Sequence, residues 1–281
     1  MPKRLKLLPL DDYRTQSIFR SLVRNSSFFD DSLRDADISI IEKKLLADGY
    51  PLDEQMQKLK ENHLYGIVEY ENLLDDSAWE IEASEGLTVT FSQVIGGQVF
   101  HPTVHTEHGI VRIAYKADFY DACKARDRAI ENSDIGEFYT VLAKGFAAVD
   151  GIINHYLEVH NRFADADNQL SERKPGGRGF LSLEQKILQL VPKMTGGTIT
   201  ETDAGWLQFL ELKELRNKSG IHPKPGEGIT TIEELADGLN KFAIGLGGLM
   251  FVLYKYFGDL IPANIIRAHW FPEVVVERYS R

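Results

Sequence analysis

One long stripe of apolar residues constrains the fold of this chain most. From Ile135 to Phe163, apolar side chains recur every three or four residues for about seven turns, at Phe138, Leu142, Phe146, Val149, Ile152, Ile153 and Tyr156. This spacing predicts a long α-helix with one apolar face. Because such a face must be covered by other elements, we expect the second half of the chain to pack around this helix.

Capping boxes mark the starts of two further helices. The segment Ser182–Gln185 opens a short helix that we expect to end at Pro192. The segment Thr231–Glu234 opens another helix, which runs through Tyr254. Each glycine in that helix is about 1 kcal/mol less favourable than alanine. Without side chains, however, these glycines allow a neighbouring backbone to approach closely. They are Gly245, Gly247 and Gly248.

A helix containing Trp206 and Phe209 lies between these two. It begins near residue 202 or 203 and is expected to stop at Ser219-Gly220, because glycine readily takes the left-handed conformation of a C-cap. We see no strand pattern in this half of the chain. Residues 135–281 are therefore predicted to form an antiparallel four-helix bundle with a C-terminal tail.

The first half has a different pattern. Helical spacing covers residues 32–48 and 52–74, and a helix is expected over 118–131. Between them lie four short segments rich in β-branched and aromatic residues, namely WEIEA, LTVTFSQVI, QVFHPTV and GIVRIAYK. They predict a small antiparallel sheet over about 79–116. The chain is thus predicted to be α+β and mostly helical, with an N-terminal α+β domain over 1–134 and the bundle over 135–281.

Charge and cysteine content limit the function classes. The net charge of −10 argues against non-specific coating of nucleic acid. Residues 1–134 carry 16 Lys and Arg against 24 Asp and Glu, whereas residues 135–281 carry 16 against 18. The local basic loops of the second half suit either an enzyme that contacts a few phosphates or ordinary solvated loops. The single cysteine, Cys123, excludes an intramolecular disulfide, so we expect a cytoplasmic protein.

We expect no membrane association. The N-terminus has no apolar segment of signal-peptide length. The longest charge-free apolar run, Phe242–Tyr254, has thirteen residues and is too short to cross a bilayer. A buried core helix is the better interpretation of that run.

Arg216 and His222 are the clearest candidate site. Five residues separate them in ELRNKSGIHPKP, where a predicted helix ends in a turn rich in Gly and Pro. Spacing alone identifies nothing, since fifteen arginines and eight histidines give about one such match by chance. The context is more selective, because Arg216 lies in the last turn of a helix, precedes the polar Asn217 and is flanked by long apolar helices.

With this motif and helix order, residues 135–260 resemble the HEPN superfamily, whose signature is Arg, a polar residue and a His four to six residues after the Arg. The resemblance implies metal-independent RNA cleavage by a homodimer with facing motifs, giving a 2′,3′-cyclic phosphate and a 5′-hydroxyl. It also suggests a toxin or defence effector with an antitoxin or regulatory partner, and no cofactor or metal. Residues 1–134 resemble no family that we recognise.

The residue chemistry suits that activity. A histidine with a pKa of about 6.5 can take a proton from a ribose 2′-hydroxyl or give one to the leaving oxygen. The planar fork of Arg216 matches the oxygens of a crowded, doubly negative phosphorane. Asn217 would orient His222 or hold a phosphate oxygen, and Lys218 and Lys224 would contact the RNA backbone. Because each protomer offers one such histidine, a separate acid and base require the partner's copy.

Two alternatives remain open. Arginine near a helix C-terminus is favoured by the helix dipole, and His-Pro after glycine is ordinary turn chemistry. The bundle would then be a non-catalytic module that dimerises or binds a nucleotide or a partner. Separately, a histidine cluster with one carboxylate has zinc-ligand chemistry, although chance clustering is the better interpretation. Its members are His101, His105, Glu107 and His108.

Three other features have unremarkable interpretations. His155 and His160 lie on the long helix, and we expect one of them to be interior and hydrogen-bonded. The segment KPGGRG, 174–179, is basic and glycine-rich but lacks the strand and the ending of a P-loop, so we interpret it as an inter-helix loop with phosphate contact as a minor alternative. Cys123 is expected to be a buried bystander.

Overall fold

The computed structural model describes residues 2–25, 43, 47, 88–90, 93–95, 98–100, 103–105, 114–174, 176, 179–200, 204–218, 228–259 and 261–279. The chain divides into two compact units. Unit 1 comprises residues 1–6, 114–261 and 274–281, and unit 2 comprises residues 7–113 and 262–273. The described part is mostly helical with short antiparallel strand pairs, which confirms the predicted α+β class.

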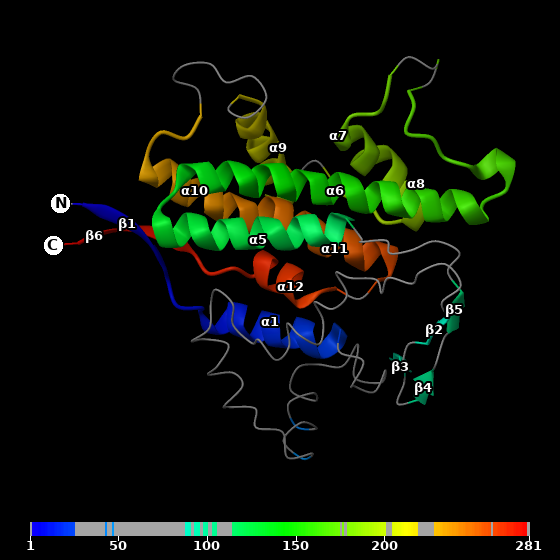
Figure 1. Cartoon of the computed structure of the whole chain (residues 1–281), viewed down its shortest axis with the longest axis horizontal. Coiled ribbons are helices and arrows are strands. Elements are labelled where there is room, and N and C mark those ends of the chain that lie inside the picture. The colour runs from blue at the N-terminus through cyan, green and yellow to red at the C-terminus, as the bar shows by residue number, and fades with distance from the viewer. Residues whose placement is uncertain are drawn as a thin grey trace. The chain divides into compact units, whose positions relative to one another are not determined.

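The long helix α6, Ile135–Phe163, is the centre of unit 1 and has the bounds predicted from the apolar stripe. Its apolar face is fully buried at Phe138, Leu142, Ile152 and Ile153. Helix α5, Ala114–Asn132, precedes it and lies alongside (Figure 1). The two helices come close at Gly151, where an added Cβ would lie 2.8 Å from Cβ of Tyr115.

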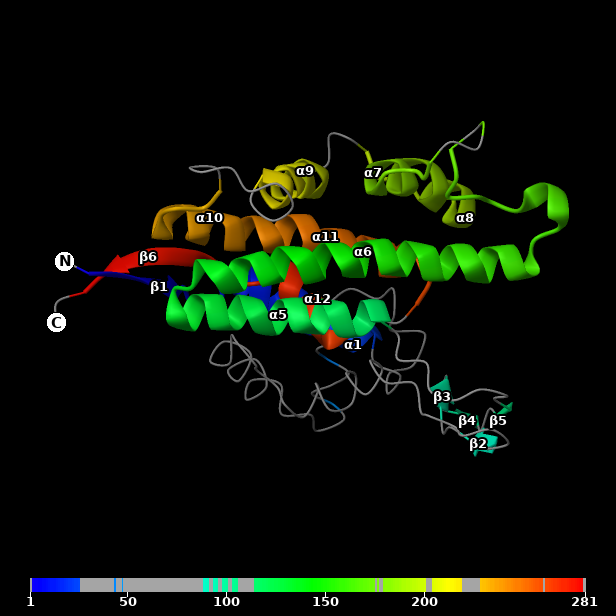
Figure 2. The ribbon, with the colours of Figure 1, turned by 45° about the horizontal axis from the view of Figure 1, so that its top comes forward.

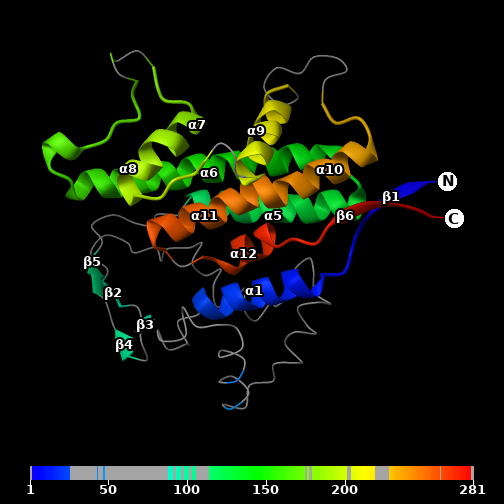
Figure 3. The ribbon, with the colours of Figure 1, turned by 180° about the vertical axis from the view of Figure 1, so that it is seen from behind.

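A second long helix covers α6. It consists of α10, Ile232–Phe242, the π-helical turn η6, Ala243–Gly247, and α11, Gly248–Phe257 (Figure 3). The predicted Thr231–Glu234 capping box is present at its start. Among the described helices, only this 26-residue segment is long and apolar enough to cross a membrane, but 67% of its apolar window is buried inside the fold. Such burial is typical of a core helix.

Helix α9, Ala204–Arg216, crosses this helix at close range (Figure 2). A Cβ added to Gly245 would lie 2.9 Å from the backbone nitrogen of Phe209, and one added to Gly205 would lie 3.1 Å from the carbonyl oxygen of Ile244. The prediction of a close backbone approach at Gly245 is therefore confirmed. The ring of Phe209 also packs 5.3 Å from that of Phe146 on α6, which fixes α9 to the core.

The short helix after Ser182 differs from its prediction at one end. The Ser182–Gln185 capping box is present, and α7, Leu183–Gln185, continues through the π-helical turn η4, Lys186–Leu190, into α8, Val191–Thr195. The expected end at Pro192 is wrong. Pro192 lies in the first turn of α8, directly after the wider π-helical turn η4, and the helix continues past it. The helix ends at Gly196, whose φ of 71° forms a left-handed cap.

The chain ends form a strand pair that the sequence analysis missed. Strand β1, Lys3–Leu7, pairs with β6, Val274–Arg278, so the expectation of no strand in the second half is wrong. The side chain of Asn240 on α10 holds β6 in place. Its Nδ2 donates to the carbonyl of Val274 at 2.9 Å, and its Oδ1 accepts from the Val274 N–H at 2.8 Å.

Unit 2 contains α1, Asp12–Asn25, and α12, Ala263–His269, which contact each other. It also contains β2, Thr88–Thr90, paired antiparallel with β5, Thr103–His105, and β3, Gln93–Ile95, paired with β4, Gln98–Phe100. The same register continues from the β2–β5 pair to the β3–β4 pair. These strands lie within the predicted sheet.

Some predicted elements lie outside the described residues, and others differ from their predictions. WEIEA and the predicted helices over 32–48 and 52–74 lie outside the description, apart from isolated helical positions at Lys43 and Ala47. The end of GIVRIAYK is helical rather than extended, because α5 begins at Ala114. The compact units also differ from the predicted boundary at 134/135, since unit 1 includes α5 and the first residues of the chain.

Replacing Gly245 with alanine should destabilise unit 1 by about 1–3 kcal/mol, because the new Cβ would overlap backbone atoms that cannot move independently. Urea unfolding followed by tryptophan fluorescence would measure the change, with buried Trp206 reporting on α9. Ile244→Ala is the matched control, because its side chain is 45% exposed and its loss should cost less than about 1 kcal/mol. Equal effects of the two substitutions would contradict the close helix crossing.

Candidate functional site

Arg216 is held at the C-terminal end of α9, as the sequence predicts. Asn217 and Lys218 extend the helix by a wider π-type turn. The Arg216 guanidinium carbon lies 4.4 Å from the centre of the Phe146 ring, a cation–π contact with the buried face of α6. Its Nη2 donates to Oδ1 of Asn217 at 3.2 Å. The two residues predicted to act together are therefore in contact.

The Arg216 guanidinium is partly desolvated and only partly paired. Its Nε atom is buried and has no hydrogen-bond acceptor among the described residues. Burial lowers the pKa of Arg216, and the carboxylate of Asp150 opposes that shift. Since arginine stays charged in proteins, the site holds a fixed positive charge whose donors are not all used.

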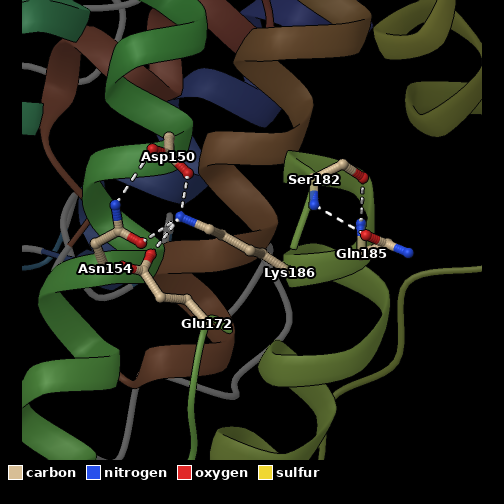
Figure 4. A network of polar contacts seen from close by, with 6 residues as sticks. All are labelled: Asp150, Asn154, Glu172, Ser182, Gln185 and Lys186. Atoms are coloured by element: carbon tan, nitrogen blue, oxygen red, sulfur yellow. Dashed lines mark hydrogen bonds and ion pairs between the residues drawn. The ribbon is translucent and has the colours of Figure 1, made fainter. Parts of the chain in front are cut away.

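A second polar cluster lies where η4 meets α6 (Figure 4). Lys186, with a side chain only 7% exposed, places its Nζ 2.9 Å from Oδ1 of Asp150 and 2.9 Å from Oε2 of Glu172. It also donates to Oδ1 of Asn154 at 2.8 Å. The Nδ2 of Asn154 donates in turn to Asp150 at 3.2 Å, so the four polar side chains form one network.

Electrostatics explain why a buried lysine is tolerated at this position. Burial lowers the pKa of Lys186, but the hydrogen bonds and charges of Asp150 and Glu172 outweigh it, and the net pKa is raised above the ordinary 10.5. Lys186 is therefore a firmly charged ammonium. The capping box beside it fixes the start of the helix that carries this lysine.

Asp150 connects the two clusters. It lies one helical turn after Phe146 on α6 and forms an ion pair with Lys186. Its carboxylate also acts electrostatically on Arg216. We call Arg216, Asn217, Asp150, Asn154, Glu172 and Lys186 the polar site. Lys186 is paired with both carboxylates of the site, whereas Arg216 makes no ion pair with a carboxylate among the described residues, so Arg216 is the cation of the site best placed to meet an anion.

The other predicted site residues are only partly described. His222 and Lys224 lie outside the described residues, so the distance from Arg216 to His222 stays a prediction. Lys218 is half exposed and pairs with Glu214 at 2.5 Å on its own helix. Lys213, one turn before Arg216, pairs with Glu184 and ties α9 to α7.

Histidines away from the motif have minor roles. His155 is exposed, with its ring centre 5.5 Å from that of Tyr115, and His160 is half-buried with Nε2 3.4 Å from the carbonyl oxygen of Asn168. Neither histidine is interior, so that part of the expectation is wrong, whereas the expected hydrogen bond is present at His160. The His101–His108 cluster lies outside the described side chains, and no metal-binding group is found among those described. Cys123 is buried, as expected, and its thiol is not in a disulfide.

Sequence reasoning missed most of the polar site. Asp150 and Asn154 stand four residues apart beside the apolar stripe, a spacing that places them on one flank of α6. That signal is weak, because most such pairs are simply solvated. Nothing in KILQL distinguishes Lys186 as buried, since its partners Asp150 and Glu172 come from distant parts of the sequence.

No protein-family model, no curated protein and no solved structure matches this chain. The chemistry of the site therefore rests on its own residues.

Replacing Lys186 with methionine should destabilise unit 1 by about 1–3 kcal/mol, because Asp150 and Glu172 would lose their shared cation. The value is below that of a fully buried pair, since both carboxylates are about 40% exposed. The matched control is Lys193→Met, an exposed lysine of the same helix, which should change the stability by less than about 0.5 kcal/mol. Urea unfolding measures both, and equal midpoints would contradict the network.

The pH dependence follows from the raised pKa of Lys186. Its stabilisation is fully present below the ordinary pKa of 10.5 and is lost as the pH rises through the higher folded value. The stability difference between wild type and Lys186→Met should therefore be constant near neutrality and narrow above about pH 10.5. A difference that grows with pH in that range would contradict the assigned ion pairs.

Proposed function

We propose that this chain is a metal-independent endoribonuclease of HEPN type that acts as a homodimer. The observation that supports the proposal best is the state of Arg216. Its guanidinium is fixed against Phe146, contacts Asn217 and keeps a buried donor without a partner among the described residues. A preorganised cation with an unused donor suits an anion whose charge increases in the transition state.

His222 supplies the proton transfer in this proposal. Five residues separate it from Arg216, a length that permits its imidazole to reach the guanidinium. The imidazole takes the proton from the ribose 2′-hydroxyl, and the resulting oxygen attacks phosphorus while the 5′-oxygen leaves with a proton from a second acid. A partner's His222 is the second acid, and the products are a 2′,3′-cyclic phosphate and a 5′-hydroxyl.

The packing of unit 1 agrees with an HEPN-like bundle, because α6, α9 and the long α10–α11 helix pack around a common core with the motif at the end of α9. In the proposal Lys218 and Lys224 contact the RNA backbone, and a toxin or defence effector with an antitoxin or regulatory partner is the biological setting. The alternative is a non-catalytic module that dimerises or binds a nucleotide or partner.

Cleavage of RNA by the purified full chain in EDTA tests the proposal. Arg216→Ala and His222→Ala should each lower the cleavage rate by about 100-fold or more. Arg216→Lys should also fail, because lysine keeps the charge but not the planar fork. The matched control is Arg162→Ala, an arginine 66% exposed at the end of α6, which should leave the rate unchanged.

Three outcomes decide between the alternatives. Cleavage that survives in both the Arg216 and the His222 variants would refute the assigned pair. Activity that disappears in EDTA would favour a metal site such as the His101–His108 cluster. A stable dimer without any cleavage would favour the non-catalytic module.

A further inference from the structure

In the segment between α6 and α7, residues 172–174 and residues 179–181 are joined by backbone contacts. We call residues 172–174 and 179–181 together the basic loop. An antiparallel bridge joins Arg173 to Phe180, the N–H of Lys174 donates to the carbonyl of Gly179 at 3.0 Å, and the N–H of Leu181 donates to the carbonyl of Glu172 at 2.7 Å. Backbone contacts thus hold the two sides of the base together.

The two neighbouring apolar residues at this base have opposite environments. Leu181 is 8% exposed and packs with Leu157 and Leu190 in a small hydrophobic cluster. Phe180 is 58% exposed, and the guanidinium carbon of Arg173 lies 5.4 Å from its ring centre. Leu181 therefore anchors the loop, whereas packing does not account for Phe180, which presents an aromatic surface beside a cation.

The basic loop is attached to the polar site. Glu172, the residue before Arg173, pairs with Lys186, and Lys186 pairs with Asp150 (Figure 4). Asp150 in turn acts electrostatically on Arg216. Two ion pairs therefore separate the base of the loop from the carboxylate beside the proposed catalytic arginine. A ligand held on the loop would lie on the same unit as Arg216 and at a fixed relation to it.

The charge of the loop is opposite to that of the chain. Arg173 and Lys174 are its cations, and its single carboxylate, Glu172, is paired with Lys186. The whole chain carries a net charge of −10. A basic loop with an exposed aromatic ring on an acidic protein selects for an anionic ligand with flat apolar faces, and a single-stranded nucleic acid has both properties.

We propose that the basic loop is a binding site for unpaired RNA, in which a nucleobase stacks on Phe180 while Arg173 and Lys174 contact the adjacent phosphates. The identification of the ligand as RNA rests on the proposed nuclease function. A base in a duplex is already stacked on both faces, so only an unstacked base can use the ring. From this loop we infer that single-stranded segments of RNA are the substrate class.

Binding of a short fluorescein-labelled single-stranded RNA, measured by fluorescence anisotropy in the His222→Ala background, tests this site without cleavage. Phe180→Ala should weaken binding roughly tenfold, and Phe180→Trp should preserve it. The matched control is Phe163→Ala, because Phe163 is an aromatic residue with 82% exposure on the same unit but outside the loop. It should bind like the parent. The same RNA annealed to its complement should bind more weakly than the single strand.

The salt dependence separates stacking from charge. Arg173→Ala and Lys174→Ala should each reduce the slope of log affinity against log salt by about 0.7, whereas Phe180→Ala should leave the slope unchanged. If only the charge substitutions weaken binding, the loop is a general anion or acidic-peptide contact and the stacking proposal is overturned. Equal affinity for single-stranded and duplex RNA would overturn it as well.

Failure of this proposal is distinguishable from failure of the proposed function. Cleavage by wild type with normal RNA affinity in Phe180→Ala would retain the nuclease and overturn the loop site. Loop-dependent RNA binding without cleavage by wild type would retain the loop site and refute the nuclease. Circular dichroism of each variant checks that the fold is intact, which is expected because Phe180 and both cations are exposed.

Discussion

Burial of the apolar face of α6 sets the position of nearly every other element in unit 1. Its rings and aliphatic chains are covered by α5, by α9 and by the long helix from Ile232 to Phe257. Close packing is possible because glycine stands at the crossing points. At Gly145 and Gly238 an added Cβ would lie within 3 Å of the side chains of Leu246 and Phe138 respectively. Such crossings leave little freedom for sliding.

The packing of that core fixes the positions of residues in the polar site. Phe146 belongs to the buried face of α6 and supports the guanidinium of Arg216. Asp150, one turn later on the same helix, pairs with Lys186 and acts electrostatically on Arg216. The cations are thus attached to a rigid helix rather than to a loop. In the proposed nuclease this arrangement would lower the barrier by fixed electrostatics, because little reorganisation is needed when negative charge develops.

The sequence predicts the local features of this chain better than the long-range ones. The bounds of α6 and both capping boxes follow from spacing within a few residues, and these predictions are confirmed. The β1–β6 pair could not be predicted, because its strands come from opposite ends of the chain and each is only five residues long. The end of α8 was predicted wrongly at Pro192, because a proline that stops a helix and a proline in a first turn cannot be told apart in sequence.

In the polar site, too, local features could be predicted from the sequence and long-range contacts could not. Arg216 and Asn217 were found because a motif is local, and the structure brings them into contact. Asp150, Glu172 and Lys186 were missed because their pairing depends on how α6, the basic loop and η4 meet in space. The exposure of Phe180 was equally hidden, since only the burial of its neighbour Leu181 shows which way the strand faces.

The chemical ends of the RNA fragments test the central claim most directly. Full-length protein is incubated with a defined single-stranded RNA in EDTA, and the fragments are identified by mass spectrometry. A 2′,3′-cyclic phosphate on one fragment and a 5′-hydroxyl on the other are the predicted products of attack by the neighbouring 2′-oxygen. A 3′-hydroxyl with a 5′-phosphate would mean that water or another nucleophile attacks phosphorus, and it would contradict the mechanism assigned to Arg216 and His222.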